Sequence, residues 1–341
     1  MPLPIVVTYT FANATTSIPL SQLDSNFTTV VNAVNGIGNG TNALSNVSIT
    51  GGAISGLTTP LAAASGGTGI TSSGTSGNVL VSNGSGWQSS PVSGLNTGVQ
   101  GNFKNLKVQV TANTTCNVTC DQITLYDGTL YSTQSTVSVS ISTGSTGANG
   151  VETGTTLTAS TWYYVWIIYN GSTVAGLISA SSTAPTMPSG YTYKARVGAV
   201  YYTSGSVLAR TLQYGRKAQY VVTASSGTTS IPYLFIGATG STSPLTWTAL
   251  SVVNFVPATS CAINLFITAS YNAGTTSNVN VAPNNSYGLP NSTNPPPMST
   301  GLSANTYITY ASWLTLESTN VYATSAASGG GLFVLGWEDN L

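Results

Sequence analysis

The stretch TWYYVWIIYNGSTVAGLIS, residues 161–179, decides the class of fold. Residues 161–169 are apolar on both faces of an extended chain, which is typical of a central strand covered on both sides. Asn170 and Gly171 follow directly and form a strong signal for a type I′ hairpin turn. We therefore expect a buried hairpin whose two strands flank this pair.

Segments around this hairpin extend the β prediction. LKVQV (106–110) and TVSVSIST (136–143) alternate with period two, as half-buried strands do. In YTYKARVGAVYY (191–202), the odd-numbered residues through Ala199 are expected to share one face. Residues 103–216 are therefore predicted to form a compact antiparallel β domain.

Residues 217–341 hold further extended segments, separated by loops rich in Asn, Ser and Pro. The segments are YLFIG, AINLFITASY, TYITYASWLTL and GLFVLGW. Regular strands with turn signals and no helical pattern favour a β-sandwich of jelly-roll type as a C-terminal tip domain. The predicted fold class is thus mainly β, with antiparallel β-sandwich or jelly-roll-like distal domains.

One segment has helical spacing. Apolar residues in the run 20–38 recur at intervals of 3, 4, 3, 4 and 3, which is the a/d seam of a short coiled coil. The seam residues are Leu20, Leu23, Phe27, Val30, Val34 and Ile37. A helix of this length is marginal alone, and the Gly-rich segment that follows offers no globular core. The spacing predicts self-association, although it also suits an amphipathic helix packed on its own domain.

Residues 39–102 are rich in Gly, Ser, Thr and Asn and contain only small apolar groups. Each group is too small to close a core within one chain, since short β segments need neighbours. Three copies wound about one axis would supply those neighbours, and glycines would allow close backbone approach. We expect an interwound β shaft here, preceded by the helix and by an extended segment, residues 1–19.

Charge is the most unusual property of the sequence. Charged residues make up 4% of the 341 residues, against about 25% in ordinary globular domains. The chain is expected to be ordered, with Ser, Thr and Asn facing water. No basic patch is large enough for nucleic acid, and no apolar run is long enough for a membrane helix. The start, MPLPIVVTYTF, lacks the pattern of a signal peptide, so we expect synthesis and assembly in a cytosol.

Catalytic machinery is hard to assemble from these residues. The sequence contains no histidine, which excludes Ser-His-Asp and Cys-His arrangements. A glycosidase needs two carboxyl groups, but Asp121, Asp127 and Glu152 are better explained by a strand start, a turn and a Gly-rich loop. Cys116 and Cys120 are interpreted as buried, inert thiols, because the chain offers no histidine to complete a metal site. We expect no enzyme, no metal and no cofactor.

Sugar binding is the more plausible chemistry. Aromatic rings on a polar, uncharged β surface can stack on sugar rings, while Asn and Ser side chains hydrogen-bond hydroxyl groups. The candidate contacts are Trp247, Tyr271 and Tyr287. Tyr310 and Trp313 are further candidates, for which an ordinary core position is the better interpretation.

Three segments, in order, resemble parts of bacteriophage tail fibre proteins. TYTFANATTSIPLSQLDSNFTTVVNAVN (8–35) resembles their N-terminal virion-attachment segment. LSNVSITGGAISGLTTPLAAASGGTG (44–69) is similar to their repetitive shafts. GANGVETGTTLTASTWYYVWIIYNGST (147–173) is similar to a β domain that recurs in phage tail fibre and prophage tail proteins. The resemblance covers roughly residues 5–216 and is weaker beyond them.

The resemblance implies a homotrimeric, non-enzymatic fibre of the virion tail, assembled in the bacterial cytoplasm. Its N-terminus would bind a tail, adaptor or baseplate protein, through an anchor that contains Ile5, Val7, Tyr9 and Phe11. Its distal domains would recognise a polysaccharide of the host cell surface. The alternative is a structural capsid, neck or tail-associated fibre that does not bind the receptor directly. The shaft is short for a long fibre, and the chain lacks the acid-rich β-helix of tailspike depolymerases.

Overall fold

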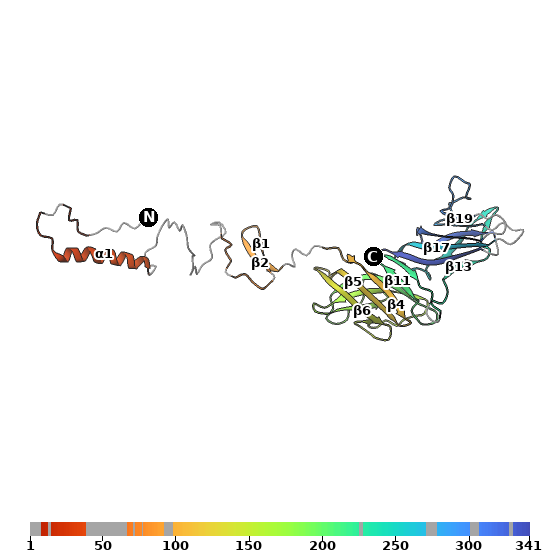
Figure 1. Ribbon diagram of the computed structural model, residues 1–341, viewed down its shortest axis with the longest axis horizontal. Coiled ribbons are helices and arrows are strands. Elements are labelled where there is room, and N and C mark those ends of the chain that lie inside the picture. Colours follow the sequence, from red (N-terminus) through yellow and green to blue (C-terminus); the bar gives the residue numbers. More distant parts are fainter. Residues whose placement is uncertain are drawn as a thin grey trace. The chain divides into compact units, whose positions relative to one another are not determined.

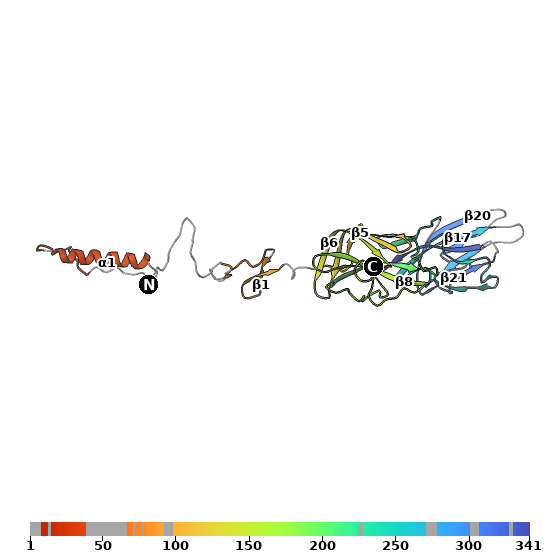
Figure 2. The same cartoon turned by 90° about the horizontal axis from the view of Figure 1, so that it is seen from below.

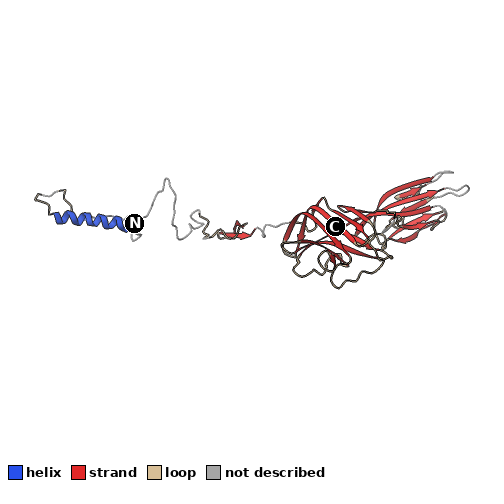
Figure 3. Ribbon diagram, turned by 60° about the horizontal axis from the view of Figure 1, so that its bottom comes forward, coloured by secondary structure: helices blue, strands red, loops and turns tan. Residues whose placement is uncertain are grey.

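The computed structural model describes residues 8–12, 15–38, 67–70, 72–76, 78–91, 98–224, 228–270, 278–300, 307–326 and 330–341. Contacts divide the chain into two compact units, residues 1–74 with 80–89 and residues 75–79 with 90–341. One helix and many strands make the chain mainly β, as predicted (Figures 1 and 3). The described part holds no helix that is both long and apolar enough to cross a membrane.

Helix α1 (Leu20–Gly38) has the bounds that the heptad spacing predicts. All six seam residues are exposed, by between 37% and 77%. Within its own compact unit, the described residues therefore leave this stripe uncovered. Thr28 and Thr29 donate hydroxyl hydrogen bonds to the carbonyls four residues earlier, which satisfies two polar side chains within the helix.

Two of the predicted anchor residues, Tyr9 and Phe11, lie in the described segment that precedes α1, whereas Ile5 and Val7 lie outside the described residues. The backbone N–H of Tyr9 donates to Oδ1 of Asn26 at 3.0 Å, and Nδ2 of Asn26 donates back to the Tyr9 carbonyl at 2.8 Å. This pair of hydrogen bonds holds the segment against the helix.

Most of the predicted shaft, including residues 39–66, lies outside the described residues. Its described part contains a two-stranded sheet, β1 (Asn78–Ser82) with β2 (Trp87–Pro91). Leu80 and Trp87 are exposed in this hairpin, so the apolar group that they form is uncovered.

Residues 98–216, here called the N-terminal β half, form a two-layer, mainly antiparallel structure with its main core between the layers and a second buried cluster on the other side of one layer. Its strands are β3 (Phe103–Lys104), β4 (Lys107–Ala112), β5 (Thr115–Tyr126), β6 (Tyr131–Ser142), β7 (Gly150–Val151), β8 (Thr161–Tyr169), β9 (Val174–Ser179), β10 (Tyr193–Tyr202) and β11 (Thr211–Tyr214). Strand β5 pairs with β6 along most of its length, with β4 over residues 115–119, and with β10 at Tyr126. Figure 2 shows this half around β5, β6 and β8.

Strand β8 is buried on both faces, as its uninterrupted apolar pattern predicts. The turn after it differs from the prediction. Tyr169 pairs with Val174, so the connection has four residues, and Oδ1 of Asn170 accepts the backbone N–H groups of residues 172 and 173. A type I′ turn needs two residues with positive φ, but here Gly171 alone has one (95°).

The face prediction for β10 is correct only for its first part. A bulge between Arg196 and Gly198 shifts the pairing with β8. Val197 consequently packs in the core between the layers, while Ala199 packs on the opposite side of the sheet. A period-two pattern cannot place residues beyond a bulge, because one extra residue reverses the faces.

The described residues of 217–341, here called the C-terminal β half, form a sandwich of two main sheets, with one separate two-stranded sheet. Its strands are β12 (Lys217–Tyr220), β13 (Tyr233–Ile236), β14 (Ser241–Thr242), β15 (Leu245–Thr246), β16 (Thr248–Ser251), β17 (Ser260–Ser270), β18 (Val279–Ala282), β19 (Met298–Thr300), β20 (Tyr307–Thr315), β21 (Asn320–Ser325) and β22 (Gly330–Asp339). One sheet has the order β13-β22-β17-β20 and the other β16-β21-β18-β19, with the main core between them. This alternation of the chain between two antiparallel sheets is the connectivity of a jelly roll.

The two β halves share one continuous sheet. Strands β11 and β12 form a hairpin whose connection is Gly215 and Arg216, so the boundary predicted between residues 216 and 217 falls inside its turn. Strand β12 then pairs with β22 of the C-terminal β half. Trp162 of β8 also packs edge-on against the fully buried Trp337 of β22, with ring centroids 5.0 Å apart. The halves therefore form one unit.

The cysteines differ sharply in environment, which gives a direct test of the N-terminal core. Cys116 and Cys120 are buried, as predicted, and burial raises their thiol pKa values to about 12 and about 11. Cys261 is exposed. Because the thiolate is the reactive form, we expect one fast-reacting thiol per folded chain at pH 8 and three after denaturation. A chromogenic thiol assay measures this, and two or three fast thiols in the native protein would contradict the described core.

Candidate functional site

One face of the shared sheet is open to solvent. In β17, Ile263 and Leu265 are fully buried, so the intervening Asn264 points away from the core. The same alternation turns Tyr214 of β11 outward, because its neighbour Gln213 is buried. We call this open side of β4, β11, β12, β22, β17 and β20 the outer face.

A row of polar side chains crosses the outer face. Directly paired residues on neighbouring strands share a face. The pairings run from Gln109 through Leu212, Gln219 and Gly336 to Asn264 and Trp313. Within the described residues, the side-chain amides of Gln109, Gln219 and Asn264 make no hydrogen bond to the chain. Their donors and acceptors are therefore free for a ligand or water.

The row passes through a hollow of about 330 Å³. Its lining includes Leu212, Tyr214, Lys217, Gln219, Asn264 and Trp313. Two of these are aromatic rings with solvent-facing surface, Tyr214 at 62% and Trp313 at 39% exposed. The volume lies in the range of small-ligand sites, which begins near 300 Å³. Rings that can stack, together with unpaired amides, form a surface suited to polyhydroxylated ligands such as sugars.

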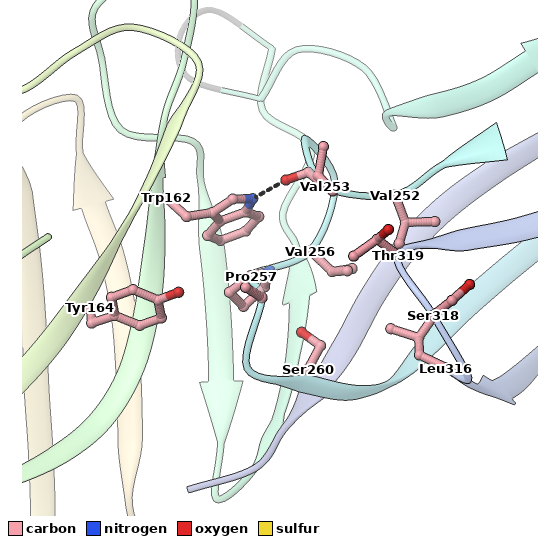
Figure 4. A pocket seen from close by; sticks show the side chains of 11 residues that line it. Trp162, Tyr164, Val252, Val253, Val256, Pro257, Ser260, Leu316, Ser318 and Thr319 are labelled. Carbon is pink, nitrogen blue, oxygen red and sulfur yellow. Dashed lines mark hydrogen bonds between the residues drawn. The ribbon is translucent and has the colours of Figure 1, made fainter. Parts of the chain in front are cut away.

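A second pocket lies between the β halves (Figure 4). Trp162 and Tyr164 of β8 face the loop 252–258, and the Trp162 indole N–H donates to the Val253 carbonyl at 3.1 Å. This pocket has a volume of about 140 Å³ and mostly apolar walls. It is smaller than ordinary ligand sites, and its indole is already paired, so we interpret it as a packing gap between the halves.

Two more hollows, of about 340 and 400 Å³, lie beside residues 100–101 and Leu341. Each contains one arginine, but both guanidinium groups already donate hydrogen bonds, Arg196 to Asp339 and Arg216 to the Leu341 carbonyl. The outer-face hollow is therefore the better candidate for a binding site.

Two of the three sequence-based sugar contacts, Trp247 and Tyr287, are described, and neither lines the outer-face hollow. The Trp247 indole N–H donates to the Tyr287 carbonyl at 2.9 Å, and both side chains are half-buried, so this pair supports the loops of the C-terminal β half. Tyr271 lies outside the described residues. The core interpretation of Tyr310 and Trp313 is wrong, because both are exposed on β20, the edge strand of the shared sheet.

The acidic residues considered for catalysis each hold local structure. Asp127 accepts two backbone N–H groups of the turn that follows it, and Asp121 accepts the side-chain amide of an asparagine. Glu152 is buried and accepts hydrogen bonds from the Ser179 hydroxyl and the Thr186 backbone. Burial acts to raise the pKa of Glu152, but these hydrogen bonds outweigh it and leave that pKa below its usual value.

The residues that sequence reasoning missed are Tyr214, Lys217, Gln219 and Asn264. One signal was available: Asn264 interrupts the apolar strand AINLFITASY at a position opposite in parity to Ile263 and Leu265. A lone amide on the second face of such a strand indicates that this face is open. No comparable local signal marks Tyr214 and Lys217, because their hairpin is short and rich in charge.

Comparisons of the chain with protein-family models, with curated proteins and with solved structures find no match. The arrangement of residues on the outer face is therefore the basis for assigning a function.

Proposed function

We propose that the chain is a bacteriophage tail fibre protein that adsorbs to a glycan of the bacterial surface through the outer-face hollow. The observation that carries this proposal is the combination of two exposed rings, Tyr214 and Trp313, with the unpaired amides of Gln219 and Asn264. The sequence segments that resemble a virion anchor and a fibre shaft precede the β halves, in the order expected of such a fibre. Individually weak contacts on several chains would add up to useful avidity on a cell surface.

The hollow takes residues from both β halves, which refines where the receptor would bind. Leu212 and Tyr214 belong to the N-terminal half, and Asn264 and Trp313 to the C-terminal half. A tip domain cut at residue 217 would remove one wall of the hollow and one strand of the hairpin. Binding experiments therefore need the full chain.

Receptor binding is tested with purified full-length protein on an array of bacterial surface polysaccharides. We expect Trp313→Ala to weaken binding to the recognised polysaccharide about tenfold or more, as removal of a central aromatic contact does. Trp87→Ala is the matched control, because Trp87 is similarly exposed but lies on β2. Equal binding by both variants would place the receptor site outside the hollow. No binding to any polysaccharide would favour the alternative, a structural fibre without direct receptor binding.

Self-association is tested by light scattering on the full chain. We expect a mass of about three chains of 34.7 kDa, because three-fold association would cover the exposed seam of α1. The double variant Phe27→Asp with Val34→Asp should lower the mass, since charges in the seam oppose association. Both side chains are exposed in the single chain, so the variant should leave the fold intact.

The control for this test is Asn32→Asp, which adds one negative charge, against two in the double variant, on the opposite side of α1, where the residue is exposed. It should keep the wild-type mass. A wild-type mass near 34.7 kDa would remove the coiled-coil and shaft proposals together.

A further inference from the structure

Two lysines flank the rings of the outer-face hollow. Nζ of Lys217 lies 5.0 Å from the centroid of the Trp313 ring, and Nζ of Lys107 lies 5.9 Å from that of Tyr214. Lys107, Tyr214 and Lys217 are directly paired across β4, β11 and β12. Two of the four lysines of the chain thus lie beside one exposed tyrosine.

These positive charges are not neutralised by a close carboxylate. In the described part of the chain, the ion pair within 4.0 Å joins Arg196 to Asp339 and involves neither lysine. Glu338 is the acid paired in register with Lys217, so Lys107, Lys217 and Glu338 together sum to +1. The remaining walls of the hollow are uncharged. In a chain with 4% charged residues, such a local excess is unusual.

We propose that this hollow binds an acidic sugar, whose carboxylate or phosphate group pairs with Lys217 and Lys107. The inference rests on the proposed function and narrows its receptor from any surface glycan to an anionic one. Tyr214 and Trp313 offer solvent-exposed aromatic surface beside the two ammonium groups, and the amides of Gln219 and Asn264 offer partners for the hydroxyls of the sugar. A lysine ammonium group is a compact charge without a preferred plane, so it can donate hydrogen bonds to a carboxylate or to a phosphate.

The charge arrangement also sets how binding responds to salt. Both lysines lie at an open surface, so their attraction for an anion is screened as ionic strength rises. Stacking on the rings is not screened in this way. Binding of an acidic sugar should therefore weaken with salt towards the affinity of its neutral counterpart.

Four probes separate these contributions by titration calorimetry on the full-length protein: D-glucuronate, D-glucose 6-phosphate, D-glucose and inorganic phosphate. We expect at least one of the two acidic sugars to bind about tenfold more tightly than glucose, as one charge-assisted contact allows. Lys217→Gln and Lys107→Gln should each reduce this preference for the acidic sugar over glucose. Trp313→Ala should weaken the binding of all three sugars. Lys194→Gln, a lysine of β10 outside the hollow, is the matched control and should behave as wild type.

The outcomes are separable. Preference for glucuronate alone identifies a uronic acid, and preference for glucose 6-phosphate alone identifies a phosphorylated sugar. This inference is overturned if glucose and both acidic sugars bind equally, or if neither lysine change affects binding. The proposed function would still stand if polysaccharide binding depends on Trp313. Inorganic phosphate bound as tightly as glucose 6-phosphate also overturns the inference, since the site would then take an anion without a sugar. The inference is also overturned if none of the four probes binds. If Lys217→Gln then lowers the mass of the protein in light scattering, the outer face joins copies of this chain.

Discussion

Replacing Asp339 with asparagine is expected to lower the free energy of unfolding by about 3 kcal/mol, as the loss of one partner of a buried ion pair does. Asp339 is fully buried, and both carboxylate oxygens accept from Nη1 of Arg196 at 2.9 Å. Arg196 is itself 12% exposed and also donates to the hydroxyl of Thr259. Removing the negative charge leaves the guanidinium group buried without its counter-ion. Chemical denaturation of the full-length protein measures the change.

The large expected loss of stability follows from the position of the ion pair between Arg196 and Asp339. Arg196 belongs to β10 of the N-terminal β half and Asp339 to β22 of the C-terminal half, so the pair links the two. Asp121→Asn is the matched control, because Asp121 is exposed and its change should cost less than about 0.5 kcal/mol. Adding Arg196→Met to Asp339→Asn should recover part of the loss, since no charge then remains unpaired. Equal stability of Asp339→Asn and Asp121→Asn would show that the pair contributes nothing.

The hydrophobic pattern of the sequence is sufficient to predict an element whose own residues show a clear spacing. Residues 161–169 became β8 with the expected bounds, because an uninterrupted apolar run of that length suits only a doubly covered strand in this context. Helix α1 followed the heptad spacing in the same way. The turn after β8 departed from expectation, because the Asn170 side chain caps a longer loop.

Pairing between distant segments was not encoded locally. The hairpin of β11 and β12 joins the halves through strands of four residues each, TLQY and KAQY, whose charged turn resembles an ordinary linker. Their pairing with β4 and β22 depends on segments that lie about one hundred residues away on either side. The boundary drawn at residue 216 therefore cut a sheet that is continuous.

The candidate site was the least predictable feature, because alternation shows which residues share a face but not which face is covered. Its place in an apolar strand favours a core position for Trp313, but the residue is exposed and pairs with the outward Asn264 on an edge strand. The error concerns long-range packing, which one sequence without its register does not specify. Trp247 stays a prediction as a sugar contact, since its ring is half-buried and its indole N–H supports a loop.

Gly336 occupies a position of the shared sheet where the backbone of a neighbouring strand lies very close. It lies on β22 between Gln219 of β12 and Asn264 of β17, in the middle of the polar row. A Cβ atom there would lie 2.0 Å from the Ala218 carbonyl oxygen and 2.8 Å from Cα of Gln219. Both are backbone atoms of β12, so no side-chain rotation relieves the contact.

Gly336→Ala is therefore expected to lower the free energy of unfolding by about 3 kcal/mol or more, at or beyond the upper end of ordinary overpacking. Strand β12 must move away from β22, which loosens the link between the β halves and displaces Lys217 and Gln219 from the hollow. Chemical denaturation measures the first effect, and polysaccharide binding by the surviving folded fraction measures the second. Gly144→Ala is the matched control, because its Cβ would meet only the Ser142 hydroxyl at an ordinary 3.6 Å. A Gly336→Ala protein as stable as Gly144→Ala would mean that β12 is not held against β22 as described.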